Sequence, residues 1–332
     1  MTRSWPAATT SASRIPRSGT RKSASLRLSW LIELGRIQAA VERARPYVLR
    51  SPLVPVEGAL LKLECLQPTG SFKVRGFFAA ALNLAPERLR RGLITVSAGN
   101  AAQACAYTAH RLGVSCRVVM YETAPALKID GVRRWGATPV LMPRDDLLAW
   151  MANEAWTKEP ETFLHPFADP DLIAGHGGIG LELLEDIRNL ERLVVPVGGG
   201  GQISGIASAV KGIRPEIEVV GVQSDGYPMW NRAFEAGGPV TLKPETIADG
   251  TTAPFDPRMF ELLKECVDRW LLVPEPRLRA AIPQIAANAK VVAEGAGALA
   301  YAALEQLEPG PTTVAVVSGG NIDPTLLASL LS

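Results

Sequence analysis

The sequence contains few cysteines and few histidines, and neither type is grouped. Its four cysteines include no C-x-x-C pair, and its three histidines, His110, His165 and His176, show no spacing typical of metal ligands. Isolated cysteines of this kind indicate reduced thiols in a cytosolic protein and argue against a disulfide framework. We therefore expect a cytoplasmic protein without a bound metal, in which each histidine has a structural role.

A strong excess of charge and long apolar runs are also missing. The net charge is +2 at pH 7, whereas a dedicated nucleic-acid-binding domain would have a strongly basic surface. No apolar run approaches the roughly 20 residues that a membrane-spanning helix needs. We expect neither nucleic acid nor a membrane as a partner. The 332 residues, of which 47% are hydrophobic, exceed the usual size of a single core and predict two lobes.

Acidic residues are absent from residues 1–30, which contain six basic residues and many serines, threonines and alanines. Such a composition cannot form a buried core and predicts disorder. It also resembles the composition of an organellar transit peptide. We interpret the segment as a disordered tail or an over-long start, and we leave it out of the fold prediction.

From about residue 31, apolar strand-like segments alternate with helical segments. GLITVS (92–97) precedes AGNAAQACAYTAHRLG (98–113), a helical segment that ends at a glycine. RLVVPV (192–197) and TTVAVVSGGN (312–321) are further strand-like segments that run into glycines. Alternation over this length predicts an α/β fold with parallel sheets and right-handed crossovers.

Ligands in such folds bind beyond the carboxyl ends of the strands. Three polar or glycine-rich turns are expected at these ends: residues 97–100, 198–201 and 318–321. Residues 198–201 are four consecutive glycines between a buried strand and an apolar helix. Backbone N–H groups in such a turn converge on an anion, and the helix N-terminus adds positive charge. Phosphate binding is therefore favoured over a purely structural turn.

The glycine turn lacks the signatures of the common nucleotide sites. The third glycine of a dinucleotide fingerprint is missing, and Gln202 and Ile203 stand where a Walker loop has its Lys-Ser/Thr. Lys73, between Phe72 and Val74, is either a solvated residue or an amine of depressed pKa that forms Schiff bases. A phosphate site and a Schiff-base lysine together point to pyridoxal phosphate, which carries a phosphate and an aldehyde.

Seven segments carry a resemblance to a known family. They are QPTGSFKVRG (67–76), SAGNAAQ (97–103), HPFADPDLIAGHGGIGLE (165–182), PVGGGGQISGIA (196–207), PETIADG (244–250), AEGAGA (293–298) and SGGNID (318–323). With these segments in the family's order, the chain resembles the fold-type II pyridoxal-phosphate enzymes of the serine/threonine dehydratase (threonine deaminase) and serine racemase group. Val74 favours the dehydratase branch, because cysteine and threonine synthases typically have Asp after the lysine.

The resemblance implies a tryptophan synthase β-like α/β fold with two lobes, each with a mainly parallel twisted sheet flanked by helices. The large, cofactor-binding lobe would comprise residues 31–91 and 170–332, and the small lobe residues 92–169. The cofactor would lie between the lobes. A homodimer or a higher homo-oligomer is implied as well.

The resemblance also implies roles for individual residues. Lys73 would form the Schiff base with pyridoxal phosphate and act as the general base. The other cofactor contacts would be Phe72 beside the ring, Asn100 at the ring hydroxyl, Ser318 at the pyridine nitrogen, Gly250 and Glu294 near the ring, and Gly198, Gly199, Gly200 and Gly201 around the phosphate. The loop that would hold the substrate carboxylate consists of Ser97, Ala98, Gly99, Asn100 and Ala101.

Several positions depart from the family pattern. Ala101 stands where a histidine is usual, which predicts a roomier pocket. Gln223, Tyr227 and Met229 stand where metal-dependent members have acidic ligands. Mg²⁺ and Ca²⁺ prefer several oxygen ligands, so we expect no divalent ion there.

The implied activity is pyridoxal-phosphate-dependent β-elimination, which converts a β-hydroxy L-amino acid such as L-threonine or L-serine to a 2-oxo acid and ammonia. A hydroxyl at Ser318 leaves the cofactor ring a weaker electron sink than a carboxylate would, and this favours elimination over transamination. A dehydratase for 3-hydroxyaspartate or a bulkier substrate and a serine racemase are alternatives. A nicotinamide-dependent oxidoreductase and a non-catalytic ligand-binding relative also remain open.

Overall fold

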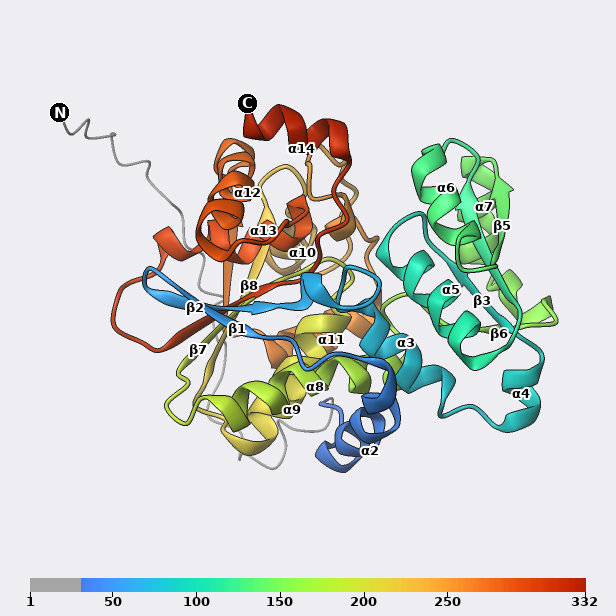
Figure 1. Ribbon diagram of the computed structural model, residues 1–332, viewed down its shortest axis with the longest axis horizontal. Coiled ribbons are helices and arrows are strands. Elements are labelled where there is room, and N and C mark those ends of the chain that lie inside the picture. The colour runs from blue at the N-terminus through green and yellow to red at the C-terminus, as the bar shows by residue number, and fades with distance from the viewer. Residues whose placement is uncertain (1–30) are drawn as a thin grey trace.

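The computed structural model describes residues 31–332, so the expectation for residues 1–30 lies outside the described residues. Figure 1 shows two sheets, each flanked by helices, in neighbouring parts of the molecule. The predicted α/β class with mainly parallel sheets is confirmed. In the described range, no helix combines the length and the apolar character needed to cross a membrane.

The larger sheet has six strands in the order β1-β2-β10-β7-β8-β9. The strands are β1 Leu53–Val56, β2 Ala59–Leu63, β7 Arg192–Pro196, β8 Glu218–Ser224, β9 Arg269–Val273 and β10 Thr313–Val317. β1 pairs antiparallel with β2, and the other neighbours pair in parallel. The carboxyl ends of the five parallel strands therefore lie along one edge of the sheet.

Side chains of the central strands are buried on both faces of the larger sheet. Val314 and Val316 of β10 belong to one core cluster, whereas Ala315 and Val317 belong to another. This alternation indicates a sheet between two helical layers, which Figure 1 shows below and above the sheet. The layers contain α8 Pro170–Asp186, α9 Gly201–Ile213, α10 Met229–Ala236 and α11 Pro257–Cys266 on one face, and α12 Glu275–Ala289, α13 Gly295–Ala302 and α14 Pro324–Leu331 on the other.

The smaller sheet has four parallel strands in the order β5-β4-β3-β6. Ile94 and Val119 pack with Trp150 on one face, and Leu93 and Val118 pack with the core of the other face. The elements are β3 Leu93–Val96, β4 Cys116–Tyr121, β5 Thr138–Met142 and β6 Thr162–Phe163, with α4 Pro86–Arg90, α5 Asn100–Leu112, α6 Ala126–Arg133 and α7 Arg144–Ala152. These strands fall within residues 92–169, and the boundaries of the two lobes stay a prediction.

Two further helices pack against α8. They are α2 Leu34–Ala44 and α3 Lys73–Ala81. α3 packs closely on α8, because a Cβ at Gly175 would lie 2.5 Å from Ala79 Cβ and one at Gly76 would lie 2.4 Å from His176 Cε1. Short 3-10 helices are η1 Arg45–Tyr47, η2 Glu64–Leu66, η3 Ala155–Lys158, η4 Asp249–Thr251 and η5 Leu304–Gln306.

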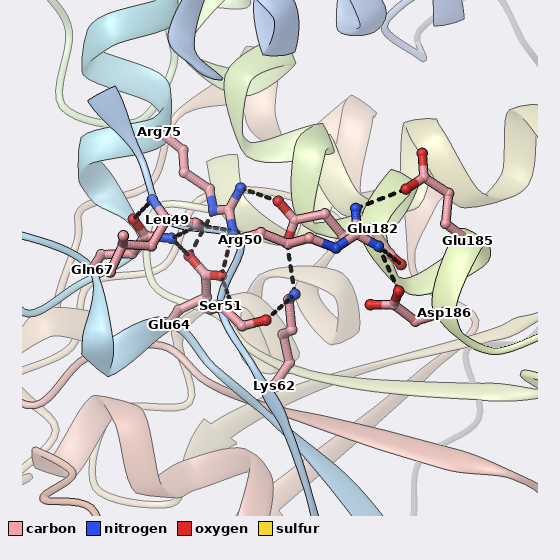
Figure 2. A network of polar contacts seen from close by, with 10 residues as sticks. All are labelled: Leu49, Arg50, Ser51, Lys62, Glu64, Gln67, Arg75, Glu182, Glu185 and Asp186. Carbon is pink, nitrogen blue, oxygen red and sulfur yellow. Dashed lines mark hydrogen bonds and ion pairs between the residues drawn. The ribbon is translucent and has the colours of Figure 1, made fainter. Parts of the chain in front are cut away.

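A buried network of charges joins α3 to α8 and to β2 (Figure 2). Arg75, only 2% exposed, donates from Nε and Nη2 to Glu64 at 2.8 and 2.9 Å. Its Nη1 and Nη2 donate to Glu182 at 2.7 and 3.0 Å. Lys62 Nζ donates to Glu182 at 2.6 Å and to the Ser51 carbonyl at 2.7 Å. Two positive and two negative charges are thus matched inside the protein.

Breaking this network by removing one charge should destabilise the fold strongly. Glu182→Gln leaves Arg75 and Lys62 with one carboxylate fewer, and an uncompensated buried charge costs about 3–5 kcal/mol. We expect a loss of this size in the free energy of unfolding, measured by chemical denaturation at neutral pH.

The matched control is Glu185→Gln on the same helix. Glu185 pairs with Arg50 at 2.7 Å, but their side chains are 66% and 50% exposed. Exposed pairs contribute less than about 1 kcal/mol. An equal effect of the two substitutions would show that the buried network does not stabilise the fold.

Candidate active site

The glycine turn connects β7 to α9, as the sequence predicted. Gly200 has φ +90°, a conformation that a residue with a Cβ rarely adopts. A Cβ at Gly199 would lie 2.3 Å from Phe167 Cγ, and a Cβ at Gly201 would lie 2.4 Å from the Phe167 carbonyl oxygen. The backbone of this turn is therefore packed against residue 167, and side chains are excluded from it.

The backbone amides of the turn are available to a ligand. The Gly198 carbonyl accepts a hydrogen bond from Trp230 Nε1 at 2.5 Å, and the N–H of a trans peptide points away from its carbonyl. Within residues 31–332, nothing accepts from the N–H groups of Gly199, Gly200 or Gly201. These N–H groups lie at the N-terminus of α9, where the helix dipole favours an anion. The turn fits a phosphate group.

Lys73 is the first residue of α3 and is partly buried. Its Nζ donates to the Pro166 carbonyl at 2.6 Å and lies 5.2 Å from the centroid of the Phe72 ring. Burial lowers the pKa of Lys73 to about 8. No carboxylate contacts this amine in the described range, so the neutral form is reached more easily than in a solvated lysine. The structure therefore does not show Lys73 as a solvated surface residue.

The turn after β10 is joined to the lysine segment. Phe72 N–H donates to the Ser318 carbonyl at 3.0 Å, and an isolated bridge pairs Ser71 with Gly319. Ser318 itself is buried. Gly250 lies near the glycine turn, because a Cβ at Gly198 would be 2.9 Å from the Gly250 carbonyl oxygen.

Asn100 ties the smaller sheet to the same place. Its Nδ2 donates to Glu294 Oε1 at 2.6 Å, and its Oδ1 accepts from Asn321 Nδ2 at 2.8 Å. Asn321 Nδ2 also lies 2.8 Å from the Thr69 carbonyl. Burial, with a further contribution from Asp249, raises the pKa of Glu294 to about 7. Two of the three turns predicted to lie at strand ends, residues 97–100 and 318–321, are thus in direct contact. The glycine turn is linked to Lys73 through Phe167, which follows Pro166.

The loop proposed for the substrate carboxylate begins α5. Ser97 Oγ accepts from the Gly99 N–H at 3.0 Å, which shapes the turn. Ala101 is buried, and Ala98 is partly buried against the core of the smaller sheet. Neither alanine offers a polar side chain, so polar contacts from these two positions can come only from the backbone.

The region expected to lack a divalent ion is occupied by internal hydrogen bonds. Gln223 Oε1 accepts from the N–H groups of Trp230 and Asn231 at 3.0 and 3.1 Å, and its Nε2 donates to the Val197 carbonyl at 3.3 Å. Among residues 31–332, no three His, Cys, Asp or Glu side chains are grouped so that they could hold a metal.

Sequence reasoning assigned no site role to four residues of the segment that follows β6. Pro166 contacts Lys73 through its carbonyl, which no side-chain pattern reveals. Phe167 lines the glycine turn, and the His165 ring packs on Phe167 with ring centroids 4.6 Å apart. His176, buried on α8, packs edge-on against Phe72 at 4.7 Å. All four residues belong to the segment 165–182. The only sequence feature that could have pointed to them is the resemblance of this segment to the family.

Comparisons with known proteins agree with this geometry. The family model described as "Pyridoxal-phosphate dependent enzyme" matches residues 44–319. The catabolic L-threonine dehydratase TdcB of Staphylococcus aureus (strain N315) is 36% identical over 330 residues, covering 94% of this chain and 95% of the relative.

Solved structures of related proteins have the same fold. The processed form of threonine deaminase isoform 2 from Solanum lycopersicum superposes with a TM-score of 0.85 at 30% identity, covering 98% of this chain and 93% of that one. Maize serine racemase gives a TM-score of 0.84 at 28% identity, covering 90% and 96%. The recognition made from the sequence is confirmed. The chain belongs to the family of pyridoxal-phosphate dependent enzymes.

Proposed function

We propose that the protein is a pyridoxal-phosphate-dependent ammonia-lyase. It removes water from a β-hydroxy L-amino acid such as L-threonine or L-serine and yields a 2-oxo acid and ammonia. The observation that carries this proposal is the partly buried Lys73 amine, which contacts the Pro166 carbonyl just before Phe167, the residue packed on the glycine turn. The chain is also similar over 94% of its length to an L-threonine dehydratase. Pyridoxal phosphate is the cofactor.

The residues around Lys73 would hold the cofactor. The amides of Gly198, Gly199, Gly200 and Gly201 would bind its phosphate, and Lys73 would bind its aldehyde covalently. Phe72 and Gly250 would flank its ring. When bound, the cofactor withdraws electrons from the substrate Cα and so acidifies the proton there.

Other residues would position the ring and the substrate. Asn100 would hydrogen-bond the ring hydroxyl, Glu294 would hold the Asn100 amide, and Ser318 would face the pyridine nitrogen. Ser97, Ala98, Gly99, Asn100 and Ala101 would surround the substrate carboxylate. These assignments are supported by the hydrogen bonds of Asn100 to Glu294 and Asn321, and by the bond from the Phe72 N–H, next to Lys73, to the Ser318 carbonyl.

Lys73 would also act as general base. A lysine with a pKa of about 8 has a substantial neutral fraction near physiological pH, and a neutral amine can take the Cα proton. The Cβ–O bond then breaks, and the oxygen leaves with its electron pair. One proton is taken from Cα and one is gained by the departing oxygen, so the elimination releases water with no net change in charge.

The cellular setting is part of the same proposal. We propose a cytoplasmic homodimer or higher homo-oligomer that acts on a small amino acid. The support is the metabolic activity named for the L-threonine dehydratase relative and the four cysteines, which are all free thiols.

Replacing the lysine should abolish catalysis. Lys73→Ala removes both the covalent partner of the cofactor and the proposed base, so release of 2-oxo acid from L-threonine should fall more than about 1,000-fold. Borohydride should attach the cofactor to the peptide containing Lys73 in the wild type and not in the variant, as read by mass spectrometry. The exposed Lys243 provides the control Lys243→Ala, which should keep both properties. Near-normal turnover in Lys73→Ala would overturn the assignment.

A side chain in the glycine turn should weaken cofactor binding. Gly199→Val places a Cβ against Phe167 and crowds the amides, so the dissociation constant of pyridoxal phosphate should rise at least about 10-fold. Visible absorbance measures the bound cofactor, and far-UV circular dichroism verifies folding. The control is Gly212→Ala near the end of α9, where a Cβ meets nothing within 4 Å. Unchanged affinity in Gly199→Val would place the phosphate elsewhere.

The protein should form almost no D-serine. Racemisation needs a base that removes the proton on one face of the planar substrate carbon and an acid that returns it on the other. In serine racemases a serine occupies the position that is Ala98 here. A methyl group neither donates nor accepts a proton. Chiral chromatography after long incubation with L-serine should detect almost no D-enantiomer, while pyruvate and ammonia accumulate. Rapid accumulation of D-serine would establish a second acid-base residue and favour the racemase alternative.

A further inference from the structure

The imidazole of His165 is held in one tautomer by the backbone that follows it. His165 lies two residues beyond β6, and its Nδ1 accepts from the N–H groups of Phe167 at 3.3 Å and Ala168 at 3.0 Å. A ring nitrogen that accepts hydrogen bonds carries no proton, so the proton of the neutral ring is on Nε2. His165 therefore presents a single N–H donor of fixed direction.

The charge state of this imidazole is fixed as well. Burial, helped by the positive charges of Arg258 and Lys73 and opposed by Asp256, lowers the pKa of His165 to about 4. A proton on Nδ1 would point toward the backbone N–H groups of Phe167 and Ala168, which now donate to this nitrogen, and both hydrogen bonds would be lost. The neighbouring rings, Phe163 and Phe167, cannot titrate. The residue is thus a neutral donor at physiological pH.

His165 directly precedes the residue that contacts Lys73. The carbonyl of the next residue, Pro166, accepts from Lys73 Nζ at 2.6 Å. The His165 ring is partly exposed, and no residue of the described range accepts from its Nε2. The Phe167 ring packs against both the imidazole and the glycine turn. The apolar Phe167 ring lies between His165 and the amides proposed to bind phosphate, and the positive charge of Lys73 helps to lower the pKa of His165. We therefore assign the free N–H to the substrate near Lys73 and not to the phosphate.

We propose that His165 is a catalytic residue whose Nε2–H donates a hydrogen bond to the β-hydroxyl oxygen of the substrate. This inference rests on the proposed function. The bond strengthens as negative charge develops on the oxygen during Cβ–O cleavage, and so it stabilises the transition state. The imidazole keeps its own proton throughout, and the protons taken from Cα and gained by the departing oxygen balance without it.

A comparison of two substrates separates this catalytic role from a structural one, because only one of their leaving groups needs a hydrogen-bond donor. In His165→Asn the side-chain oxygen can still accept from the two backbone N–H groups, but the Nε2–H is lost. Turnover of L-serine should fall about 100-fold, as for loss of one transition-state donor. Turnover of β-chloro-L-alanine, which releases chloride, should change less than about 5-fold. The control His110→Asn changes an exposed histidine on α5 and should leave both rates unchanged.

Equal losses for L-serine and β-chloro-L-alanine would overturn the proposal, and so would a raised dissociation constant for pyridoxal phosphate with an unchanged ratio of the two rates. His165→Gln repeats the comparison with a longer amide in case the first variant does not fold. Nitrogen-15 NMR of the histidines in the wild-type holoenzyme is independent of any variant's folding. For His165 it should show Nε2 protonated and Nδ1 unprotonated between about pH 5 and 8. Titration of the His165 ring in that range would also overturn the proposal.

The wild type itself separates this inference from the function on which it rests. Failure of the wild type to release 2-oxo acid from any hydroxy amino acid would overturn the proposed function and the inference with it. A wild type that turns over L-serine, combined with a His165→Asn variant whose two rates fall equally, would overturn the inference alone.

Discussion

The ion pairs of Arg75 with Glu64 and Glu182 fix the position of the helix on which the chemistry depends. Lys73 lies two residues before Arg75, at the start of α3, so any shift of this helix moves the amine. Burying four charges is unfavourable by itself and is tolerated only where each charge finds its partners. The network therefore selects one arrangement of α3, α8 and β2, and Lys73, the proposed Schiff-base residue, is aligned as a consequence.

Around this fixed helix, function is assembled from segments that are far apart in sequence. The turns after β7 and β10 lie at one edge of the larger sheet, because parallel strands end at the same edge of a sheet. The turn after β3 comes from the smaller sheet and reaches the turn after β10 through Asn100. Asn100 then bridges the two sheets through Glu294 and Asn321. The proposed anion site consists of backbone amides, whereas the hydrogen bonds of Asn100 to Glu294 and Asn321 are made by side chains. The first requires residues without side chains, and the second requires particular side chains.

The sequence was sufficient for features that depend on local pattern. Alternating apolar segments predicted the α/β class, and four glycines after a strand predicted the turn that connects β7 to α9. Anion binding by that turn stays a prediction. Contacts made by backbone atoms could not be read in this way: the Pro166 carbonyl that holds Lys73 has no side-chain signature. The tautomer of His165 is similarly set by two amides that follow it. Isolated histidines were expected to be structural, and composition alone gave no reason to separate His165 from the other two.

The ion pair between Lys128 and Asp249 has a consequence for the rate at which substrate enters and product leaves the proposed active site. It joins α6 of the smaller sheet to η4 of the larger part at 2.5 Å, with side chains 34% and 60% exposed. Such a pair contributes at most about 1 kcal/mol, or a factor of about five in population. It breaks and re-forms readily, and salt weakens it further. Breaking the Lys128–Asp249 ion pair is therefore not a slow step, and product departure need not wait for it.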